Sequence, residues 1–281
     1  MKKSYLKARK KRRKGTIPPA KKALGQNFLT DEHLLDELAE LTQASSDDCV
    51  LEIGAGPGGL SLPIAKRAGK LICVELDGDL LPYLKIKLEG HENVSIIQGD
   101  ALTLDLDEIL SPYQNIRIVG NLPYHLTTPL MERFFSMQTP LKSVSVMVQK
   151  EAGERICADR GTSLFGPLGA LVRLHGEPEV AKEVPARLFS PPPKVDSVFL
   201  HIPFYENLMA YEDRQKLIKF IRQCFLQKRK TLYNNLQSYK SLPRETWMDI
   251  FQNLDLPPTV RAEEVDVDTF RRLYTLIEEK Q

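Results

Sequence analysis

The chain has 281 residues, of which 42% are hydrophobic and 27% charged, so it can form a large and a small domain around a real hydrophobic core. The net charge of +2 conceals an asymmetry, because residues 1–30 hold eleven lysines and arginines and no acid; 39 minus 11 leaves 28 basic against 37 acidic residues in the rest. No apolar run approaches the roughly 20 residues that span a bilayer, so we expect no membrane-spanning segment.

Residues 1–20 form a basic tail that we expect to be disordered when free. Its charge is concentrated in Lys10, Lys11, Arg12 and Arg13. Such a cluster suits a nucleic-acid backbone because binding releases counterions, but a nuclear address or a contact with anionic lipids would use the same residues. The tail lacks the apolar core of a signal peptide, and its clustered lysines are atypical of a transit peptide.

The cysteines and histidines suggest neither disulfides nor a metal site. Four cysteines lie far apart without a CxxC pair, and five histidines show no metal-ligand spacing. We therefore expect a cytoplasmic protein with reduced thiols and no bound metal.

After the tail, apolar runs alternate with polar turns in the pattern of an α/β protein. The turn-like residues 25–27 precede a plausible N-cap at Thr30-Asp31, and leucines then recur at helical spacing. A further helix is expected at about 78–88. Short apolar runs predict strands at 49–53, 70–75, 94–97, 116–119 and 143–148.

A glycine loop follows the first of these five strands. It contains Gly54 and Gly56, and the next strand ends about 20 residues later in Glu75. Strand, glycine loop and helix build the cofactor-binding turn of a doubly wound sheet, and a carboxylate at the next strand end binds ribose hydroxyls. This pattern predicts a nucleoside cofactor and leaves NAD and S-adenosylmethionine as candidates.

Two more polar residues follow the third and fourth strands. Asp100 could accept a hydrogen bond from an adenine amino group or be an ordinary turn residue, and Asn121 follows the run at 116–119. The carboxyl ends of parallel strands meet at one edge of a sheet, where open α/β sheets bind their ligands. We therefore expect Gly54, Glu75, Asp100 and Asn121 to line one site.

The stretch Gly120-Asn121-Leu122-Pro123-Tyr124 suits chemistry on a nucleobase amino group. That group is a poor nucleophile because its lone pair is delocalised into the ring. The side-chain oxygen of Asn121 and the carbonyl of Leu122 could both accept from it and favour a pyramidal nitrogen, most strongly in the transition state. Pro123 would fix the turn and Tyr124 could stack on a flipped base. The alternative is an ordinary turn with a capping Asn and a buried Tyr.

The segment after this stretch predicts a helix, and two strand-like runs lie further on. Thr127-Thr128-Pro129 suits a helix N-cap and first helical position. The strand-like runs are at 168–174 and 198–202. Between them, Phe189 begins a stiff proline-rich segment and could complete an aromatic sandwich around a base, or be a buried aromatic or part of a proline-rich partner motif.

From about residue 204 the pattern is helical alone. Apolar stripes at 217–225, 247–254 and 270–277 predict three amphipathic helices. Lys228, Arg229 and Lys230 form a basic cluster that would suit a polyanion or be a solvated helix face.

Seven ordered blocks together resemble the small-subunit (16S) ribosomal RNA adenine N6-dimethyltransferases, the kasugamycin-sensitivity methylases, from about residue 21 to 277. They are Leu24-Gly25-Gln26-Asn27-Phe28-Leu29, Leu51-Glu52-Ile53-Gly54, Gln98-Gly99-Asp100-Ala101, Gly120-Asn121-Leu122-Pro123-Tyr124, Val148-Gln149-Lys150-Glu151, residues 189–197, and Arg229-Lys230-Thr231-Leu232 with Asn234-Asn235.

The resemblance implies the fold, the reaction and the partner. Residues 21–203 would form the Rossmann-like sheet of a class I methyltransferase, and residues 204–281 a smaller all-helical domain that binds RNA. The enzyme would use S-adenosylmethionine to dimethylate N6 of two adjacent adenosines near the 3′ end of small-subunit rRNA. We expect it to act as a monomer on a pre-subunit particle late in assembly.

By position, the resemblance also implies roles for particular residues. The cofactor site would comprise Asn27, Leu29, Gly54, Gly56, Glu75, Asp100 and Asn121, of which Asn27 and Leu29 rest on the resemblance alone. The catalytic residues would be Asn121, Leu122, Pro123, Tyr124 and Phe189. RNA would contact Lys10, Lys11, Arg12, Arg13, Lys228, Arg229 and Lys230. The departures from the family pattern are Ala55, His125 and Phe165.

Three rival functions share part of this pattern. A large-subunit rRNA adenine methylase is opposed by Val195-Asp196-Ser197 and by Arg229-Lys230-Thr231. A non-catalytic assembly factor, or a transcription factor on a methylase scaffold, would not need an intact loop from Asn121 to Tyr124. In an NAD-dependent oxidoreductase, that loop would have no role.

Overall fold

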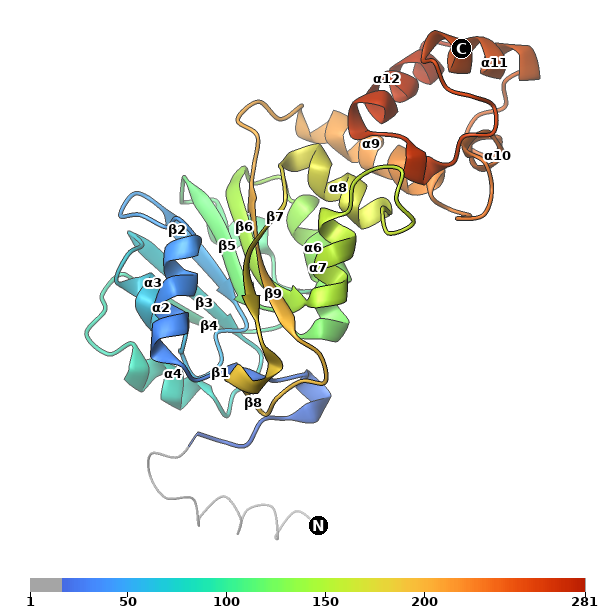
Figure 1. Cartoon of the computed structure of the whole chain (residues 1–281). Coiled ribbons are helices and arrows are strands. Elements are labelled where there is room, and N and C mark those ends of the chain that lie inside the picture. The colour runs from blue at the N-terminus through green and yellow to red at the C-terminus, as the bar shows by residue number, and fades with distance from the viewer. Residues whose placement is uncertain (1–16, 281) are drawn as a thin grey trace, which may run out of the picture.

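A seven-stranded sheet with the order β4-β3-β2-β5-β6-β9-β7 forms the centre of the computed structural model, which describes residues 17–280 (Figure 1). The first five of these strands are parallel, whereas β9 and β7 run antiparallel to β6 and β9 respectively. The strands are β2 (Cys49–Ile53), β3 (Lys70–Glu75), β4 (Val94–Gln98), β5 (Ile116–Asn121), β6 (Leu141–Gln149), β7 (Glu179–Val184) and β9 (Ser197–Pro203).

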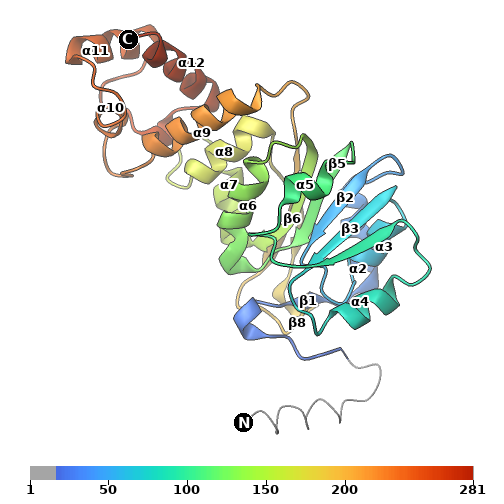
Figure 2. The same cartoon turned by 180° about the vertical axis from the view of Figure 1, so that it is seen from behind.

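Helices cover both faces of this sheet (Figures 1 and 2). One face carries α2 (Glu32–Leu41), α3 (Ser61–Ala65) and α4 (Leu81–Lys87), and the other α5 (Leu106–Leu110), α6 (Thr127–Phe135), α7 (Lys150–Cys157) and α8 (Pro167–His175). Strand β2 is therefore buried along its whole length, which explains its nearly continuous apolar sequence.

A short second sheet pairs distant parts of the chain at the carboxyl ends of the parallel strands. It consists of β1 (Phe28–Leu29) and β8 (Phe189–Ser190), which run antiparallel. Short 3₁₀ helices flank it and the loops: η1 (Lys22–Leu24), η2 (Tyr124–Leu126), η3 (Ala186–Leu188) and, near the C-terminus, η4 (Ala262–Glu264). The pair fastens the start of the described chain to the proline-rich segment.

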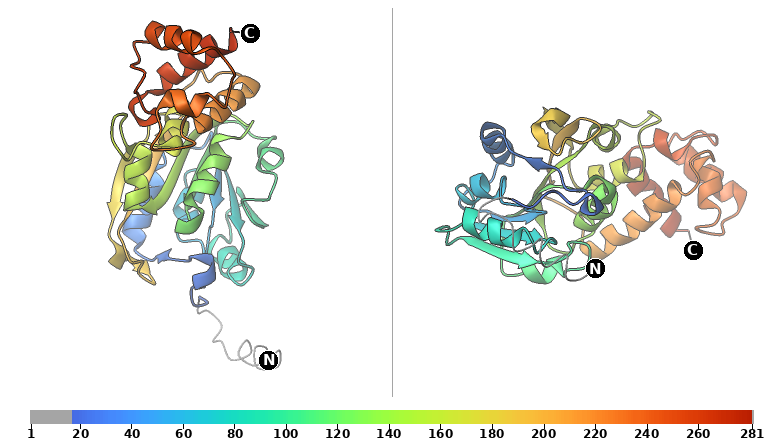
Figure 3. Two further views of the ribbon diagram at one scale, coloured as in Figure 1. Left: turned by 90° about the vertical axis from the view of Figure 1, so that its right-hand side faces the viewer. Right: turned by 90° about the horizontal axis from the view of Figure 1, so that it is seen from below.

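The C-terminal helices are α9 (Tyr211–Cys224), α10 (Leu232–Leu236), α11 (Arg244–Asn253) and α12 (Val267–Glu278). They lie at the opposite end of the molecule from the N-terminal segment (Figure 3). Their apolar stripes belong to the same hydrophobic core as this face of the sheet, with α9 and α12 packed against α8. The rings of Phe165 and Phe225 meet edge to face with 6.1 Å between centroids. The three predicted helices in this region are confirmed.

The predicted strand at 168–174 is wrong, because these residues form helix α8. Periodicity does not separate a short, fully buried helix from a strand, and α8 lies buried between α6, α7 and α9. The Gly166-Pro167 pair was the discriminating feature, since proline suits the first helical position. Strand β7 was missed because its charged sequence at the sheet edge has no apolar run.

The predicted helix starts near 78 and 127 need smaller corrections. Helix α4 begins only at Leu81. Thr127 is the first residue of α6 and not its N-cap, because η2 runs directly into the helix. The predicted cap at Asp31 is confirmed, since its side chain accepts a hydrogen bond from the Leu34 N–H at 3.0 Å.

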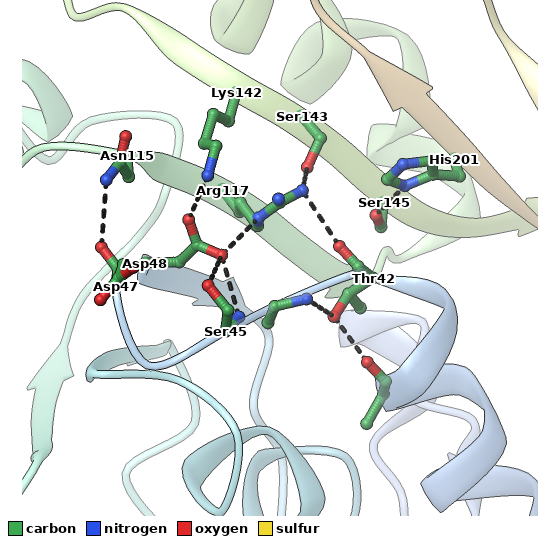
Figure 4. A network of polar contacts seen from close by, with 12 residues as sticks. Thr42, Ser45, Asp47, Asp48, Asn115, Arg117, Lys142, Ser143, Ser145 and His201 are labelled. Carbon is green, nitrogen blue, oxygen red and sulfur yellow. Dashed lines mark hydrogen bonds and ion pairs between the residues drawn. The ribbon is translucent and has the colours of Figure 1, made fainter.

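A buried polar network ties together the amino-terminal ends of the central strands (Figure 4). Asp48 accepts from Arg117 Nε at 2.9 Å, from Lys142 Nζ at 2.8 Å and from the backbone and hydroxyl of Ser45 at 2.9 Å. Arg117 also donates to Ser143. The network joins β2, β5 and β6 at their amino-terminal ends. It therefore stabilises the sheet at the end opposite the carboxyl termini of these strands.

No helix within residues 17–280 is long and apolar enough to span a membrane. All four cysteines are unpaired, and three of them are buried. The basic residues Lys10, Lys11, Arg12 and Arg13 lie outside the described part of the chain.

Candidate active site

A cavity of about 200 Å³ opens at the carboxyl ends of β2, β3, β4 and β5. The strand-end residues predicted from the sequence meet there. Its lining includes Gly54, Gly56, Glu75, Asp100 and Asn121, together with Asn27 from the N-terminal segment. Residues almost one hundred positions apart thus share one wall.

Glu75 holds the glycine loop in place. Its two carboxylate oxygens accept the backbone N–H groups of Gly56 and Asp77, each at 2.7 Å. Burial raises the pKa of Glu75 and these hydrogen bonds oppose the rise. Gly56 has φ of +58°, and a Cβ there would lie 3.3 Å from the Phe28 ring, so the position favours glycine. Each oxygen of Glu75 keeps a lone pair for a ligand hydroxyl.

The cavity also has an apolar wall suited to a planar base. Leu76, directly after Glu75, is 47% exposed although it is a large apolar side chain. It lines the cavity with Ala101. Asp100 uses one oxygen to accept the Leu102 N–H at 2.9 Å, which fixes the orientation of its carboxylate.

Asn121 has a defined orientation. Its side-chain Nδ2–H donates to the backbone carbonyl of Asn27 at 2.8 Å. The amide geometry then turns Oδ1 away from Asn27, and no group within residues 17–280 donates a hydrogen bond to it. The next residue, Leu122, has a buried side chain and donates its N–H to the Met147 carbonyl at 3.3 Å. An amide oxygen that can still accept a hydrogen bond is thus held at the wall of the cavity.

The predicted aromatic pair is not assembled around this cavity. Tyr124 is half-buried and its hydroxyl lies 2.7 Å from Ser197 Oγ; burial raises its pKa, so the phenol stays neutral near pH 7. Phe189 is 3% exposed and packs in the core beside α2. Neither ring lines the cavity, and stacking by Phe189 would require movement of the β1–β8 pair. Leu29, opposite Phe189 in that pair, lies behind the cavity wall.

Comparison with known proteins identifies the family to which a chain with this site belongs. Residues 18–278 match the family model described as ribosomal RNA adenine dimethylase. The chain belongs to this family. The enzyme is therefore an rRNA adenine dimethyltransferase, and the methyltransferase fold implied by the sequence is confirmed.

Individual relatives agree over nearly the full length. The enzyme is 35% identical over 253 residues to ribosomal RNA small subunit methyltransferase A of Clostridium botulinum, covering 90% of this chain and 92% of the relative. It is 36% identical over 268 residues to the protein of the same name from Latilactobacillus sakei, covering 92% and 90%.

Two solved structures are similar. A dimethyladenosine transferase from Plasmodium falciparum has a TM-score of 0.76 at 26% identity, covering 90% of this chain and 98% of that one. The 23S rRNA methyltransferase ErmE has a TM-score of 0.71 at 24% identity, covering 90% and 100%, and shows the shared fold.

Sequence reasoning missed a polar clamp beside the cavity of the enzyme, to which only Gln26 of the clamp contributes a lining residue. Lys21 Nζ contacts Asp77 at 2.5 Å and Asp79 at 3.1 Å, and Gln26 Nε2 donates to Asp77 at 3.0 Å. Burial alone would raise the pKa of Asp77, but these hydrogen bonds outweigh it and lower the pKa. The clamp holds the N-terminal segment against the loop after β3. Its partners are more than fifty residues apart, so no local pattern could reveal it.

His125, a departure from the family pattern, lies at the rim of the same cavity. A Cβ on Gly25 would come within 3.1 Å of its Nδ1, and Gly25 has φ of +65°. The imidazole therefore packs directly on the turn before Asn27, and glycine at that turn makes the close approach possible.

The basic cluster of the C-terminal region is solvent-exposed. Lys228, Arg229 and Lys230 are all exposed, and Lys228 Nζ donates to the Ser163 carbonyl at 3.0 Å. Within residues 17–280 there is no group of three or more His, Cys, Asp or Glu side chains arranged to hold a metal ion.

Proposed function

We propose that this enzyme transfers methyl groups from S-adenosylmethionine to N6 of two adjacent adenosines near the 3′ end of small-subunit rRNA, giving two dimethyladenosines. We also propose that it acts as a cytoplasmic monomer on a pre-subunit particle late in assembly. The orientation of Asn121 carries the assignment, since its Nδ2 is bound to Asn27 and its Oδ1 is available to a substrate amino group. The names of the bacterial relatives support the small subunit as target.

The residues of the cavity fit the proposed donor. Glu75 can accept from ribose hydroxyls and Asp100 from the adenine amino group, while Leu76 offers an apolar surface to the base. The glycine loop lets the backbone approach closely. When bound, S-adenosylmethionine supplies an electrophilic methyl group.

The protein contributes to the reaction mainly through positioning. Asn121 Oδ1 and the Leu122 carbonyl would accept from the adenine amino group and favour the pyramidal nitrogen, so these bonds strengthen in the transition state. Alignment of the reacting atoms supplies up to roughly 7–11 kcal/mol. No strong base is needed, because the methylated nitrogen is acidic and loses its proton to water.

RNA binding would use the C-terminal region. We propose that residues 204–281 form an RNA-binding domain in which Lys228, Arg229 and Lys230 contact phosphates, with Lys10, Lys11, Arg12 and Arg13 of the tail adding further contacts. Exposed cations release counterions on binding, so affinity should fall steeply with salt.

The test is methyl transfer from labelled S-adenosylmethionine to under-methylated small ribosomal subunits, with large subunits as a parallel substrate. We expect label in the RNA of the small subunit alone. Label in the large subunit instead would favour the macrolide-resistance type of activity. Tight binding to small subunits without any transfer would favour an assembly factor.

A further inference from the structure

Arg133, on helix α6, holds the loop that carries Asp100. Its Nη1 donates to the backbone carbonyl of Leu102 at 2.8 Å, and its Nη2 donates to the backbone carbonyl of Leu104. A guanidinium is planar and donates in fixed directions, so these two hydrogen bonds hold the loop at two points. Helix α6 begins directly after η2, and its Leu130 lines the cavity. The helix that forms part of the cavity wall thus also fixes the loop after β4.

The two residues that accept from Arg133 are also the ones that hold Asp100. The Leu102 N–H donates to Asp100 Oδ1 at 2.9 Å, and the Leu104 N–H donates to the Asp100 carbonyl at 2.9 Å. The side chain of Leu104 packs on Gly99, where an added Cβ would lie 2.8 Å from it. A shift of either carbonyl would therefore move Asp100.

Few other contacts restrain this loop. Its start is joined to β3 by the Gly99 N–H, which donates to the Glu75 carbonyl at 3.0 Å. Within residues 17–280, Arg133 is the only side chain outside the loop that forms a hydrogen bond with residues 100–104. The orientation of the Asp100 carboxylate therefore depends on Arg133 more than on any other side chain.

The surroundings of Arg133 are unfavourable for a residue that only stabilises the fold. The side chain is half-buried, and no carboxylate among residues 17–280 forms an ion pair with it. Its Nε is buried and has no hydrogen-bond partner in the same part of the chain. A cation removed from water without an anion costs free energy, and an apolar side chain of similar length would avoid that cost. These features favour a role in the site.

We propose that Arg133 is a positioning residue for the methyl donor. It holds Asp100 so that Oδ2, the carboxylate oxygen that the Leu102 N–H does not occupy, meets the 6-amino group of the donor adenine. Arg133 would then affect which base the cavity selects, and not only how tightly the donor binds. This inference rests on the proposed role of Asp100 as the acceptor from that amino group.

The test compares two ligands by calorimetry: S-adenosylmethionine and its analogue in which hydrogen replaces the adenine 6-amino group. We expect the wild type to prefer S-adenosylmethionine by at least about 10-fold, since the analogue lacks a hydrogen bond to a charged group. Arg133→Met should weaken binding of S-adenosylmethionine about 10-fold and leave affinity for the analogue nearly unchanged, because only the amino group needs an oriented carboxylate. The preference should almost vanish, while kcat at saturating donor stays close to that of the wild type.

Arg173→Met is the matched control. Arg173 Nη2 donates to the backbone carbonyls of Cys157 at 2.9 Å and Ala158 at 3.3 Å, and its Nε is likewise buried without a partner among residues 17–280. Arg173 also forms ion pairs, so its removal should disturb the fold at least as much. The segment that it holds contributes no residue to the cavity. Its variant should therefore keep the wild-type preference, whatever its melting temperature.

Two further variants distinguish positioning from a general loosening of the fold. Arg133→Lys keeps the charge but replaces the planar fork by a single ammonium, so we expect an intermediate preference; it also provides the test if Arg133→Met does not fold. In an Asp100→Ala background the preference should already be lost, and Arg133→Met should change it no further.

The wild-type preference in every Arg133 variant that folds would overturn the proposal. An equal loss of affinity for both ligands would overturn it as well, because that is the result of a structural role alone. Equal binding of the two ligands by the wild type would refute the role of Asp100, and the proposal with it. Methyl transfer by the wild type tests the proposed function separately.

Discussion

Replacing Asn121 by alanine removes two interactions that the structure separates. The Nδ2–H bond to the Asn27 carbonyl, 2.8 Å long and partly buried, holds the N-terminal segment against the cavity. The oxygen on the other side of the amide is assigned to the substrate amino group. The first interaction affects donor binding and the second affects the chemical step, so the two effects appear in different kinetic constants.

The expected loss of S-adenosylmethionine affinity and the expected loss of kcat differ by more than experimental error. Loss of the bond to Asn27 costs about 0.5–1.5 kcal/mol, which is at most about 10-fold in donor affinity. Loss of an oriented group that acts in the transition state costs about 2.7–4 kcal/mol, or 10²–10³ in kcat. Asn121→Ala should therefore show a modestly weaker donor Kd and a kcat lower by at least about 100-fold.

Single-turnover methyl transfer with saturating donor measures the chemical step, and calorimetry measures donor affinity. Lys21→Met is the matched control, because it loosens the same segment by removing the contacts to Asp77 and Asp79 without touching the oxygen of Asn121. It should weaken donor binding and leave kcat nearly unchanged. A kcat in Asn121→Ala within a few fold of wild type would refute the role of Asn121. An equal loss of kcat in Lys21→Met would assign the effect to closure of the segment.

Three further outcomes follow from the contacts described. Ser197→Ala removes the partner of the Tyr124 hydroxyl and should raise KM for the subunit several-fold by freeing the ring, while donor affinity stays the same; an unchanged KM would contradict a positioning role. Gly56→Ala should weaken binding of S-adenosylmethionine about 10-fold. The left-handed backbone costs a non-glycine residue about 1–2 kcal/mol, and its relaxation would shift the hydrogen bond from the N–H of residue 56 to Glu75. Calorimetry measures this affinity, and an unaltered affinity would contradict the expectation. Asp48→Asn should lower the free energy of unfolding near pH 7 by about 3 kcal/mol, as for a broken buried ion pair. Burial alone would raise the pKa of Asp48, but its hydrogen bonds lower the pKa below 3.8. The wild type therefore loses this stability as the pH falls through 3.8 and below. Urea unfolding at a series of pH values should show a smaller loss of unfolding free energy at acid pH for the variant than for the wild type, and an equal loss in both would argue against the network.

Much of the fold was predictable because parallel strands buried on both faces leave continuous apolar runs. Strands β2, β3 and β5 appear at nearly the expected residues. The site was predictable for a topological reason, since Gly54, Glu75, Asp100 and Asn121 all lie at or just after the ends of strands that finish at one edge of the sheet. Their meeting in one cavity required only that the strands be parallel and adjacent.

The remaining features depend on contacts between distant segments. Helix α8 was mistaken for a strand because its burial removes the polar face by which a helix is recognised. The clamp of Lys21 on Asp77 depends on how the N-terminal segment crosses the loop after β3. The placement of Phe189 depends on the pairing of β1 with β8. Each of these strands has only two residues, which is too short for a sequence pattern to reveal it.

The most direct test of the central claim is mass analysis of the 3′-terminal rRNA fragment after small subunits are treated with wild-type enzyme and with Asn121→Ala. The account predicts two neighbouring N6-dimethyladenosines with wild type and an almost unmodified fragment with the variant. Modification at another position, or the same two dimethyladenosines formed at the same rate by both proteins, would contradict it.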